Sequence, residues 1–135
     1  MILKSTKEIG KSLPIEYSKF IKSLNHEVSN IALVIICTPM SEYKKIIPKL
    51  NQSLNSKCLI TDVGSTKKNI ISLKNKVLDK KLDWISSHPI AGSEVSGPEY
   101  GNKNLFVNKW CIIIKEKKNK SKKINLLKEF WKKIG

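Results

Sequence analysis

Seven consecutive apolar residues, Ile31 to Cys37, limit the possible folds of this chain more than any other feature. Most of them are β-branched, and a continuous run of such residues is typical of a strand buried on both faces of a parallel sheet. A membrane-spanning helix needs roughly 20 apolar residues, whereas this run ends at Thr38-Pro39. The sequence therefore predicts a central strand of an α/β fold and no transmembrane segment.

The residues around this run alternate between strand-like and helix-like patterns. Further strands are expected at Cys58–Val63, Trp84–Ser87 and Val107–Lys115, and helices at Pro14–Leu24, Ser41–Leu50, Lys67–Leu78 and along the apolar stripe Ile124–Ile134. Strands and helices in alternation indicate an open, mostly parallel α/β sheet with flanking helices. We expect a single domain without internal repeats.

Three polar turns follow strands of this predicted sheet. They are Thr38-Pro39, Gly64-Ser65 and His88-Pro89. In open α/β sheets, ligands bind beyond the carboxyl ends of the strands, where such turns meet. We therefore expect the three turns to lie together at one edge of the sheet and to form the functional site.

Taken alone, residues of these turns can perform acid–base chemistry. The imidazole of His88 can accept or donate a proton near neutral pH, Ser65 can hydrogen-bond to it or to a substrate, and Glu94 supplies a carboxylate. A serine hydrolase is disfavoured because Ser65 lacks the G-x-S-x-G turn of α/β hydrolases. The alternative is that His88 only ends its strand and has no catalytic role.

Two strings resemble motifs of a known family. DVGSTK (Asp62–Lys67) and SHPIAGSEVSG (Ser87–Gly97), followed by Leu105-Phe106 and a strand, resemble the prephenate/arogenate dehydrogenase family of tyrosine biosynthesis. The strand and turn of Ile31–Pro39 are similar to the family's preceding strand. The resemblance implies a Rossmann-type domain and the NAD- or NADP-dependent oxidative decarboxylation of prephenate or arogenate, giving 4-hydroxyphenylpyruvate or tyrosine.

The resemblance also implies catalytic and substrate-binding residues. His88 matches the motif histidine, which hydrogen-bonds the ring hydroxyl of the substrate and takes its proton as hydride leaves. Ser65 matches the motif serine, which orients this histidine and contacts the same hydroxyl. Ser93 and Glu94 match positions that shape the substrate side of the pocket.

On the cofactor side, the resemblance implies that Thr38, Pro39 and Gly64 line the nicotinamide cofactor, because turns at strand ends permit close backbone approach. NAD or NADP acts as the hydride acceptor, while the protein supplies position and electrostatics. No metal ion is expected.

Two parts of the family's pattern are missing from this sequence. The family begins with a G-x-G-x-x-G turn that binds the cofactor pyrophosphate, and here only the segment around Gly10 and Ser12 is similar to the end of that pattern. The family also continues into a helical domain that forms a homodimer, whereas this chain stops at Gly135. Residues 1–135 thus resemble an incomplete nucleotide-binding domain without the C-terminal helical dimerisation domain. A catalytically inactive remnant of that domain is the alternative.

The charge leaves a second alternative open. The formal net charge is +15 and every basic residue is a lysine, so the run Lys115–Lys123 is a candidate polyanion-binding surface. Nucleic-acid binding is disfavoured because specific recognition depends on the bidentate hydrogen bonds of arginine. A/T-rich codons would also place lysine at solvated positions without any binding role.

The cysteines indicate a reducing environment. Cys37, Cys58 and Cys111 are far apart in the sequence, and each lies in or beside an apolar run. Such spacing fits small buried thiols and not disulfides or a zinc site. Because the N-terminus also has no secretory signal, we expect a cytoplasmic protein.

Overall fold

The computed structural model describes residues 2–5, 19–20, 31–92, 102 and 104–135. Within these residues, one sheet has the strand order β2-β1-β3-β4-β5, and a second sheet pairs β6 with β7. The strands are β1 (Ile2–Ser5), β2 (Lys19–Phe20), β3 (Ile31–Ile36), β4 (Leu59–Asp62), β5 (Asp83–Trp84), β6 (Ser86–Pro89) and β7 (Cys111–Ile114). The helices are a 3-10 turn (Met40–Glu42), α1 (Tyr43–Ser53), α2 (Lys67–Val77) and α3 (Ser121–Ile134).

Strands β3, β4 and β5 form the parallel part of the main sheet. Leu33 pairs with Leu59 across β3 and β4, and Ile60 pairs with Trp84 across β4 and β5. All of β4 is buried, as is β3 after its first residue, as expected for strands covered on both faces. The predicted α/β fold with a parallel sheet and flanking helices is confirmed, with β1 and β2 added as antiparallel strands at one edge.

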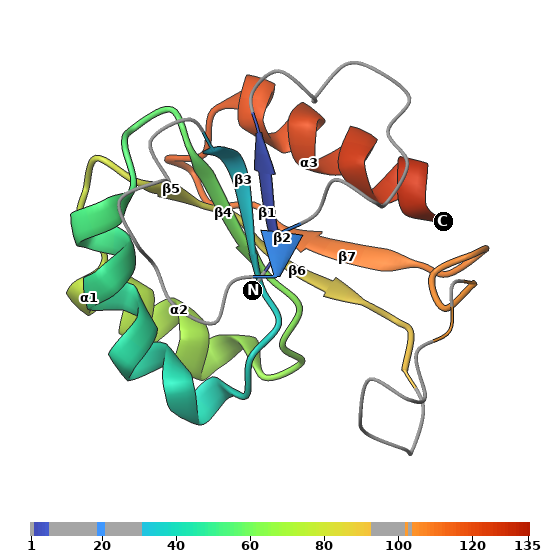
Figure 1. Ribbon diagram of the computed structural model, residues 1–135, viewed down its shortest axis with the longest axis horizontal. Helices are drawn as coiled ribbons and strands as arrows, with labels where there is room; N and C mark the ends of the chain where they lie inside the picture. The colour runs from blue at the N-terminus through green and yellow to red at the C-terminus, as the bar shows by residue number, and fades with distance from the viewer. Residues whose placement is uncertain (1, 6–18, 21–30, 93–101, 103) are drawn as a thin grey trace.

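Helices cover both faces of this sheet. Figure 1 shows α1 and α2 on one side and α3 on the other. The buried residues of α1, which include Ile47 and Leu50, recur three and four positions apart and pack with Trp84, as the apolar stripe of an amphipathic helix does. On the opposite face, α3 buries Leu127 and Trp131. No helix in the described ranges is both long enough and apolar enough to cross a membrane.

Two predictions about secondary structure are wrong. The helix expected at Pro14–Leu24 fails at Lys19–Phe20, which form strand β2 against β1; its other residues lie outside the described ones. The apolar residues of this segment are spaced as in a helix, and that spacing carries no information about pairing with β1. The strand expected from Val107 begins only at Cys111, because residues 104–108 form turns in which Asn108 adopts a positive φ of 57°.

Two smaller differences lie close to the predicted turns. The strand expected at Trp84–Ser87 is divided, since Trp84 ends β5 while Ser86 begins β6, which pairs with β7. Cys37, expected to be buried, is exposed because β3 ends one residue before it. Cys58 is buried as predicted.

Candidate active site

Backbone and side-chain hydrogen bonds bring the three polar turns to one edge of the sheet. The Val63 amide, just after β4, donates to the Ile36 carbonyl at the end of β3 (3.3 Å). The carbonyl oxygen of Val63 lies 3.3 Å from Nδ1 of His88 on β6. The turn after β4 therefore contacts His88 on one side, and its first residue is hydrogen-bonded to the end of β3 on the other.

The hydrogen bond to Val63 determines which nitrogen of His88 is free. A carbonyl oxygen can only accept a hydrogen bond, so Nδ1 must carry the proton in this contact. In the neutral imidazole, Nε2 then keeps an unshared electron pair. In this arrangement Nε2 is the nitrogen of the half-buried ring that can accept a hydrogen bond.

A buried polar cluster connects the end of β4 to Ser87, the residue before this histidine. Asp62, which is fully buried, accepts from the Trp84 indole nitrogen (3.0 Å) and from Nζ of Lys67 (2.5 Å). Lys67 also donates to the Ser87 carbonyl (2.5 Å). The hydroxyl of Ser87 donates to the Asp62 carbonyl (3.0 Å) and is 2.9 Å from the hydroxyl of Thr61.

The residues of this cluster are functional candidates that the sequence pattern did not indicate. Asp62 and Lys67 stand at the two ends of the DVGSTK string, and Ser87 begins the second one. Asp62 is a charged residue at the end of an otherwise apolar strand. This position in the sequence could have indicated a buried polar contact. A buried carboxylate needs a partner, and the lysine five residues later supplies it.

The turn after β3 contains a buried hydroxyl. Among the described residues, Oγ1 of Thr38 is buried without a hydrogen-bond partner, and so is the hydroxyl of Tyr43 at the start of α1. Burial, together with the nearby charge of Asp62, raises the pKa of the Tyr43 hydroxyl above its usual range, so this group stays neutral. Buried polar groups are normally paired. Thr38 is therefore a position where a bound molecule can supply the missing partner.

The other predicted site residues are placed as follows. Pro39 and Ser65 are exposed in the turns after β3 and β4. A Cβ on Gly64 would come within 3.0 Å of Ile70 Cδ1 and 3.6 Å of Met40 Cγ. Because glycine has no Cβ, Ile70 of α2 can pack closely against this turn. Ser93, Glu94, Gly10 and Ser12 lie outside the described residues.

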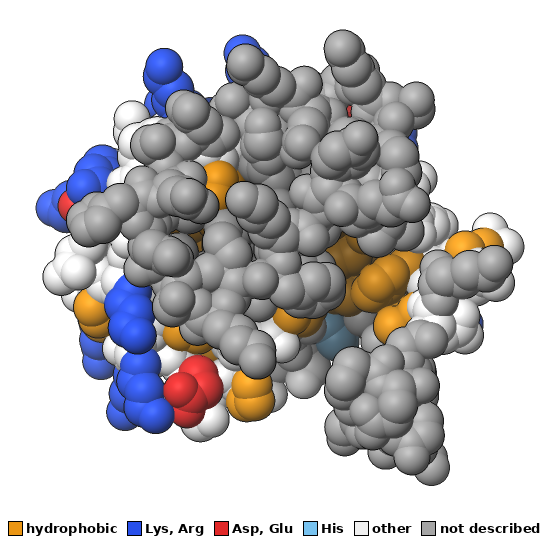
Figure 2. All heavy atoms as spheres, in the orientation of Figure 1, with side chains coloured by type: hydrophobic (Ala, Val, Ile, Leu, Met, Phe, Trp, Pro, Cys, Tyr) orange, Lys and Arg blue, Asp and Glu red, His pale blue; other side chains and the backbone are white. Residues whose placement is uncertain are grey.

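A shallow cavity opens at His88. Its volume is about 380 Å³, and it is lined by His88, Pro89, Ile90, Ala91, Gly92, Leu105 and Lys109. In the β6–β7 ladder His88 is directly opposite Ile112, so the two side chains project from the same face. Ile112 is 52% exposed, and Figure 2 shows hydrophobic side chains gathered at the surface on this side of the molecule. Ile112 is thus a candidate site residue that the sequence pattern did not indicate.

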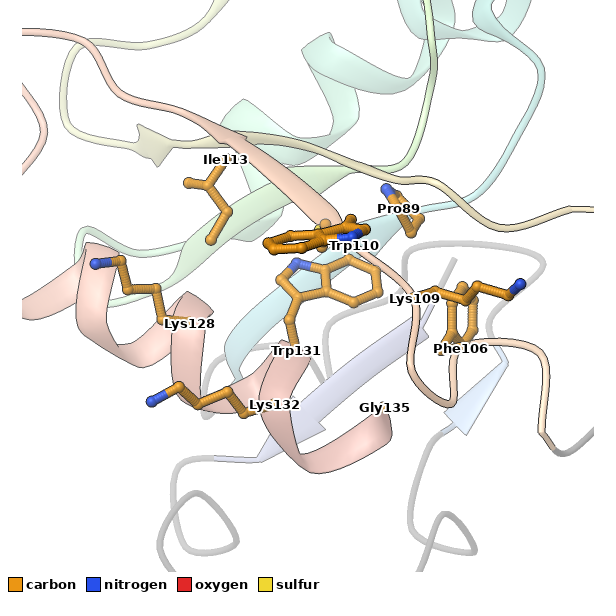
Figure 3. A pocket seen from close by; sticks show the side chains of 10 residues that line it. Pro89, Phe106, Lys109, Trp110, Ile113, Lys128, Trp131, Lys132 and Gly135 are labelled. Carbon is orange, nitrogen blue, oxygen red and sulfur yellow. The ribbon is translucent and has the colours of Figure 1, made fainter.

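A second cavity lies behind the same strands, between β7 and α3 (Figure 3). Its volume is about 410 Å³, and Pro89, Trp110 and Trp131 are among its lining residues. Because side chains alternate along a strand, Pro89 projects from the face of β6 opposite to His88. This cavity shares Pro89 and Lys109 with the one beside His88, but His88 itself does not line it.

The lysine run Lys115–Lys123 contributes partly to the fold. Lys118 forms an ion pair with Glu116 (3.5 Å), and Lys123 forms one with Asp83 (2.8 Å). An open groove of about 820 Å³ beside the run is lined by Lys74, Lys80, Lys81, Lys117, Lys118 and Lys120 together with Asp79, Asp83 and Glu116. A polyanion-binding role for these lysines stays a prediction. No group of three His, Cys, Asp or Glu side chains in the described ranges is arranged to hold a metal ion.

Comparison with known proteins gives a consistent result. The sequence profile described as prephenate dehydrogenase, nucleotide-binding domain, matches residues 5–135. The prephenate dehydrogenase of Bacillus subtilis is 33% identical over 106 residues, which are 78% of this chain and 29% of that protein. The cyclohexadienyl dehydrogenase of Zymomonas mobilis is 27% identical over 103 residues, 76% of this chain and 35% of that protein.

Solved structures agree with these sequence matches. The prephenate dehydrogenase of A. aeolicus, in complex with hydroxyphenyl propionate and NAD+, superposes with a TM-score of 0.69 at 35% identity over 78% of this chain and 36% of that chain. The arogenate dehydrogenase of Synechocystis has the same fold, with a TM-score of 0.68 at 24% identity over 76% of this chain and 36% of that one. The chain thus spans only about a third of the length of the proteins it resembles.

Proposed function

Since the chain belongs to the prephenate dehydrogenase family, whose nucleotide-binding domain it matches, we propose a role within such an enzyme. The chain is proposed to carry the cofactor site and the proton acceptor of a prephenate or arogenate dehydrogenase. The observation that carries the proposal is the contact between His88 Nδ1 and the Val63 carbonyl. It leaves Nε2 as the atom that can accept a proton from a substrate hydroxyl.

The proposed reaction is the oxidative decarboxylation of a cyclohexadienol. When bound, the nicotinamide cofactor accepts the hydride from the ring carbon that bears the hydroxyl. Nε2 of His88 accepts the hydroxyl proton as this carbon gains carbonyl character, which avoids a build-up of positive charge. The ring carboxylate leaves as carbon dioxide, and the electrons of the broken bond complete the aromatic ring. His88 then returns its proton to the phenolate oxygen, so that the protons balance.

The cofactor is proposed to lie over the turns after β3 and β4. The carboxyl ends of parallel strands are where α/β sheets bind nucleotides. Thr38 Oγ1, buried without a partner among the described residues, fits a hydrogen bond to the cofactor. The proposal includes Pro39 and Gly64 as lining residues and either NAD or NADP as the cofactor.

The substrate is proposed to bind in the cavity beside His88. Ser65 is proposed to contact the ring hydroxyl and to orient His88, with Ser93 and Glu94 on the substrate side of the pocket. Ile112 is not part of the cavity lining, but it projects from the same face as His88 and is proposed to supply apolar surface for the substrate ring. The proposal for the whole protein also includes a homodimer and a cytoplasmic location.

Cofactor binding tests this proposal directly. Isothermal calorimetry of the 135-residue chain with NAD+ and NADP+, with and without prephenate, should show binding of one of them that tightens when prephenate is present. A chain that is folded by circular dichroism and binds neither cofactor contradicts the proposal.

A further inference from the structure

The strand that carries His88 separates from the main sheet just before the site. β5 pairs with β4, and the last backbone hydrogen bond described in this ladder runs from the Ile85 amide to the Ile60 carbonyl (2.9 Å). From Ser86 onward the strand pairs with β7 instead, and Figure 1 shows β6 and β7 extending away from the main sheet. The position of His88 relative to β4 therefore depends on contacts other than this ladder.

Lys67 makes one such contact, in addition to the hydrogen bonds that the Ser87 hydroxyl forms with Thr61 and the Asp62 carbonyl. From the first turn of α2, its Nζ donates to Oδ2 of Asp62 on β4 and to the carbonyl of Ser87 on β6, each at 2.5 Å. Ser87 directly precedes His88. One ammonium group thus connects the end of β4 to the residue before the proposed proton acceptor.

Burial makes this connection specific. Asp62 is 0% exposed and the Lys67 side chain is 11% exposed, so neither charge is well solvated. A charge taken out of water is tolerated only when it is paired and its hydrogen-bonding capacity is used. Asp62 achieves this through Lys67 and Trp84. The ammonium group is thereby held in place, and it restrains the Ser87 carbonyl while the Ser87 hydroxyl is bound separately to β4.

We propose that Lys67 is a positioning residue that holds His88 in the Nδ1-protonated form against Val63, and so keeps Nε2 free for the substrate. This inference rests on the proposed function only for the role of Nε2. Other lysines of the chain also join a carboxylate to backbone carbonyls, and Lys67 differs from them in which carbonyl it contacts. The second hydrogen bond, to the backbone next to His88, is what assigns Lys67 to the site.

The chain offers a matched control lysine. The Lys123 side chain is 15% exposed, and its Nζ also bridges a carboxylate and backbone carbonyls, those of Asp83 (2.8 Å), Ser56 (2.9 Å) and Cys58 (3.1 Å). Its partners lie where β4 and β5 begin, at the end of the sheet opposite His88. Lys123→Met therefore removes a bridge of the same chemical kind without touching the proposed site.

Nitrogen NMR of the histidine rings tests the inference. The chain has two histidines, His26 and His88, so His26→Gln assigns the signals. Spectra are taken at a pH where the ring is neutral. The wild type should show one tautomer, with Nδ1 protonated and Nε2 bare. Lys67→Met should show averaged signals from both tautomers, because the Val63 contact is lost.

A second variant covers the case in which Lys67→Met unfolds because Asp62 is left charged and buried without its ion-pair partner. The double variant Asp62→Asn/Lys67→Met removes both charges and should fold, yet it should show the same averaged ring signals. Lys67→Arg should restore a single tautomer at least in part.

Three results would overturn the inference. They are averaged signals in the wild type, a single Nδ1-protonated tautomer in the folded double variant, and the same averaging in Lys123→Met. Failure of the proposed function is seen separately, since a chain that does not bind NAD+ or NADP+ can still give the predicted ring signals.

Discussion

The indole nitrogen of Trp84 donates to Oδ1 of Asp62 at 3.0 Å. Trp84 is the largest fully buried side chain among the described residues, and this contact links it to the carboxylate that binds Lys67 next to the proposed site. The core and the site are therefore coupled through one carboxylate.

Removal of this donor should weaken the fold. In Trp84→Phe one Asp62 oxygen loses a partner in a buried position, which costs about 1–3 kcal/mol of the free energy of unfolding in addition to the lost packing. Trp131→Phe is the matched control, because among the described residues the Trp131 indole nitrogen has no partner. Urea unfolding should show the larger loss in Trp84→Phe. Equal losses would mean that the Asp62 hydrogen bond adds nothing.

Thr38 provides a test of the cofactor side. Thr38→Val keeps the shape of the side chain and removes a buried hydroxyl without a described partner, so thermal stability should be unchanged or higher. A hydrogen bond to the cofactor contributes about 0.5–1.5 kcal/mol, so the Kd for NAD+ or NADP+ should rise roughly 2–10-fold. The comparison is made by calorimetry on wild type and variant. An unchanged Kd would remove Thr38 from the cofactor site.

Ile112 provides a test of the substrate side. Ile112→Ala should weaken the prephenate-dependent tightening of cofactor binding roughly 5–30-fold, which corresponds to about 1–2 kcal/mol of apolar contact. Stability should change little because the side chain is 52% exposed. Val77→Ala is the control, since Val77 is also an exposed apolar residue (38%) but lies on α2. If both variants bind prephenate alike, Ile112 does not contact the substrate.

Because the thiol of Cys58 is buried, we expect the free energy of unfolding to fall at alkaline pH. Burial raises the pKa of this thiol from 9.0 to about 12. The folded state therefore keeps the thiol proton while the unfolded chain releases it. This contribution to stability is complete below pH 9.0 and is lost as the pH rises through about 12.

Unfolding in urea at pH 8 and pH 10.5 measures this effect. Each unit of pH above the unfolded pKa costs up to about 1.4 kcal/mol, so the wild type should lose roughly 1–2 kcal/mol more than Cys58→Ala between the two conditions. Lysine titration affects both proteins and cancels in the difference. Parallel losses would show that Cys58 does not titrate differently on folding.

The elements that the sequence predicted well are those with long, regular apolar patterns. β3 and β4 follow from continuous β-branched runs, and α1, α2 and α3 from apolar residues spaced three and four apart. The DVGSTK and SHPIAGSE strings indicated the family, and the strand-end rule placed His88 beside the turn that contains Val63.

The parts that were missed depend on partners distant in the sequence. β2 is two residues long and exists through its pairing with β1. The change of partner between Trp84 and Ser86 depends on β7, about 25 residues later in the chain. The hydrogen bonds of Lys67 to two different strands could not be read from spacing, since they require the strands to be in place first.

The most direct test of the central claim is prephenate-dependent reduction of NAD+ or NADP+ by a chimera. In this chimera the chain replaces the matching region of the Bacillus subtilis prephenate dehydrogenase, to which it is 33% identical over 106 residues. The account predicts reduced cofactor and carbon dioxide in equal amounts, and a loss of about 10²–10⁴-fold in rate for His88→Gln. A His88→Gln chimera that binds the cofactor and is as active as the unsubstituted one would contradict it.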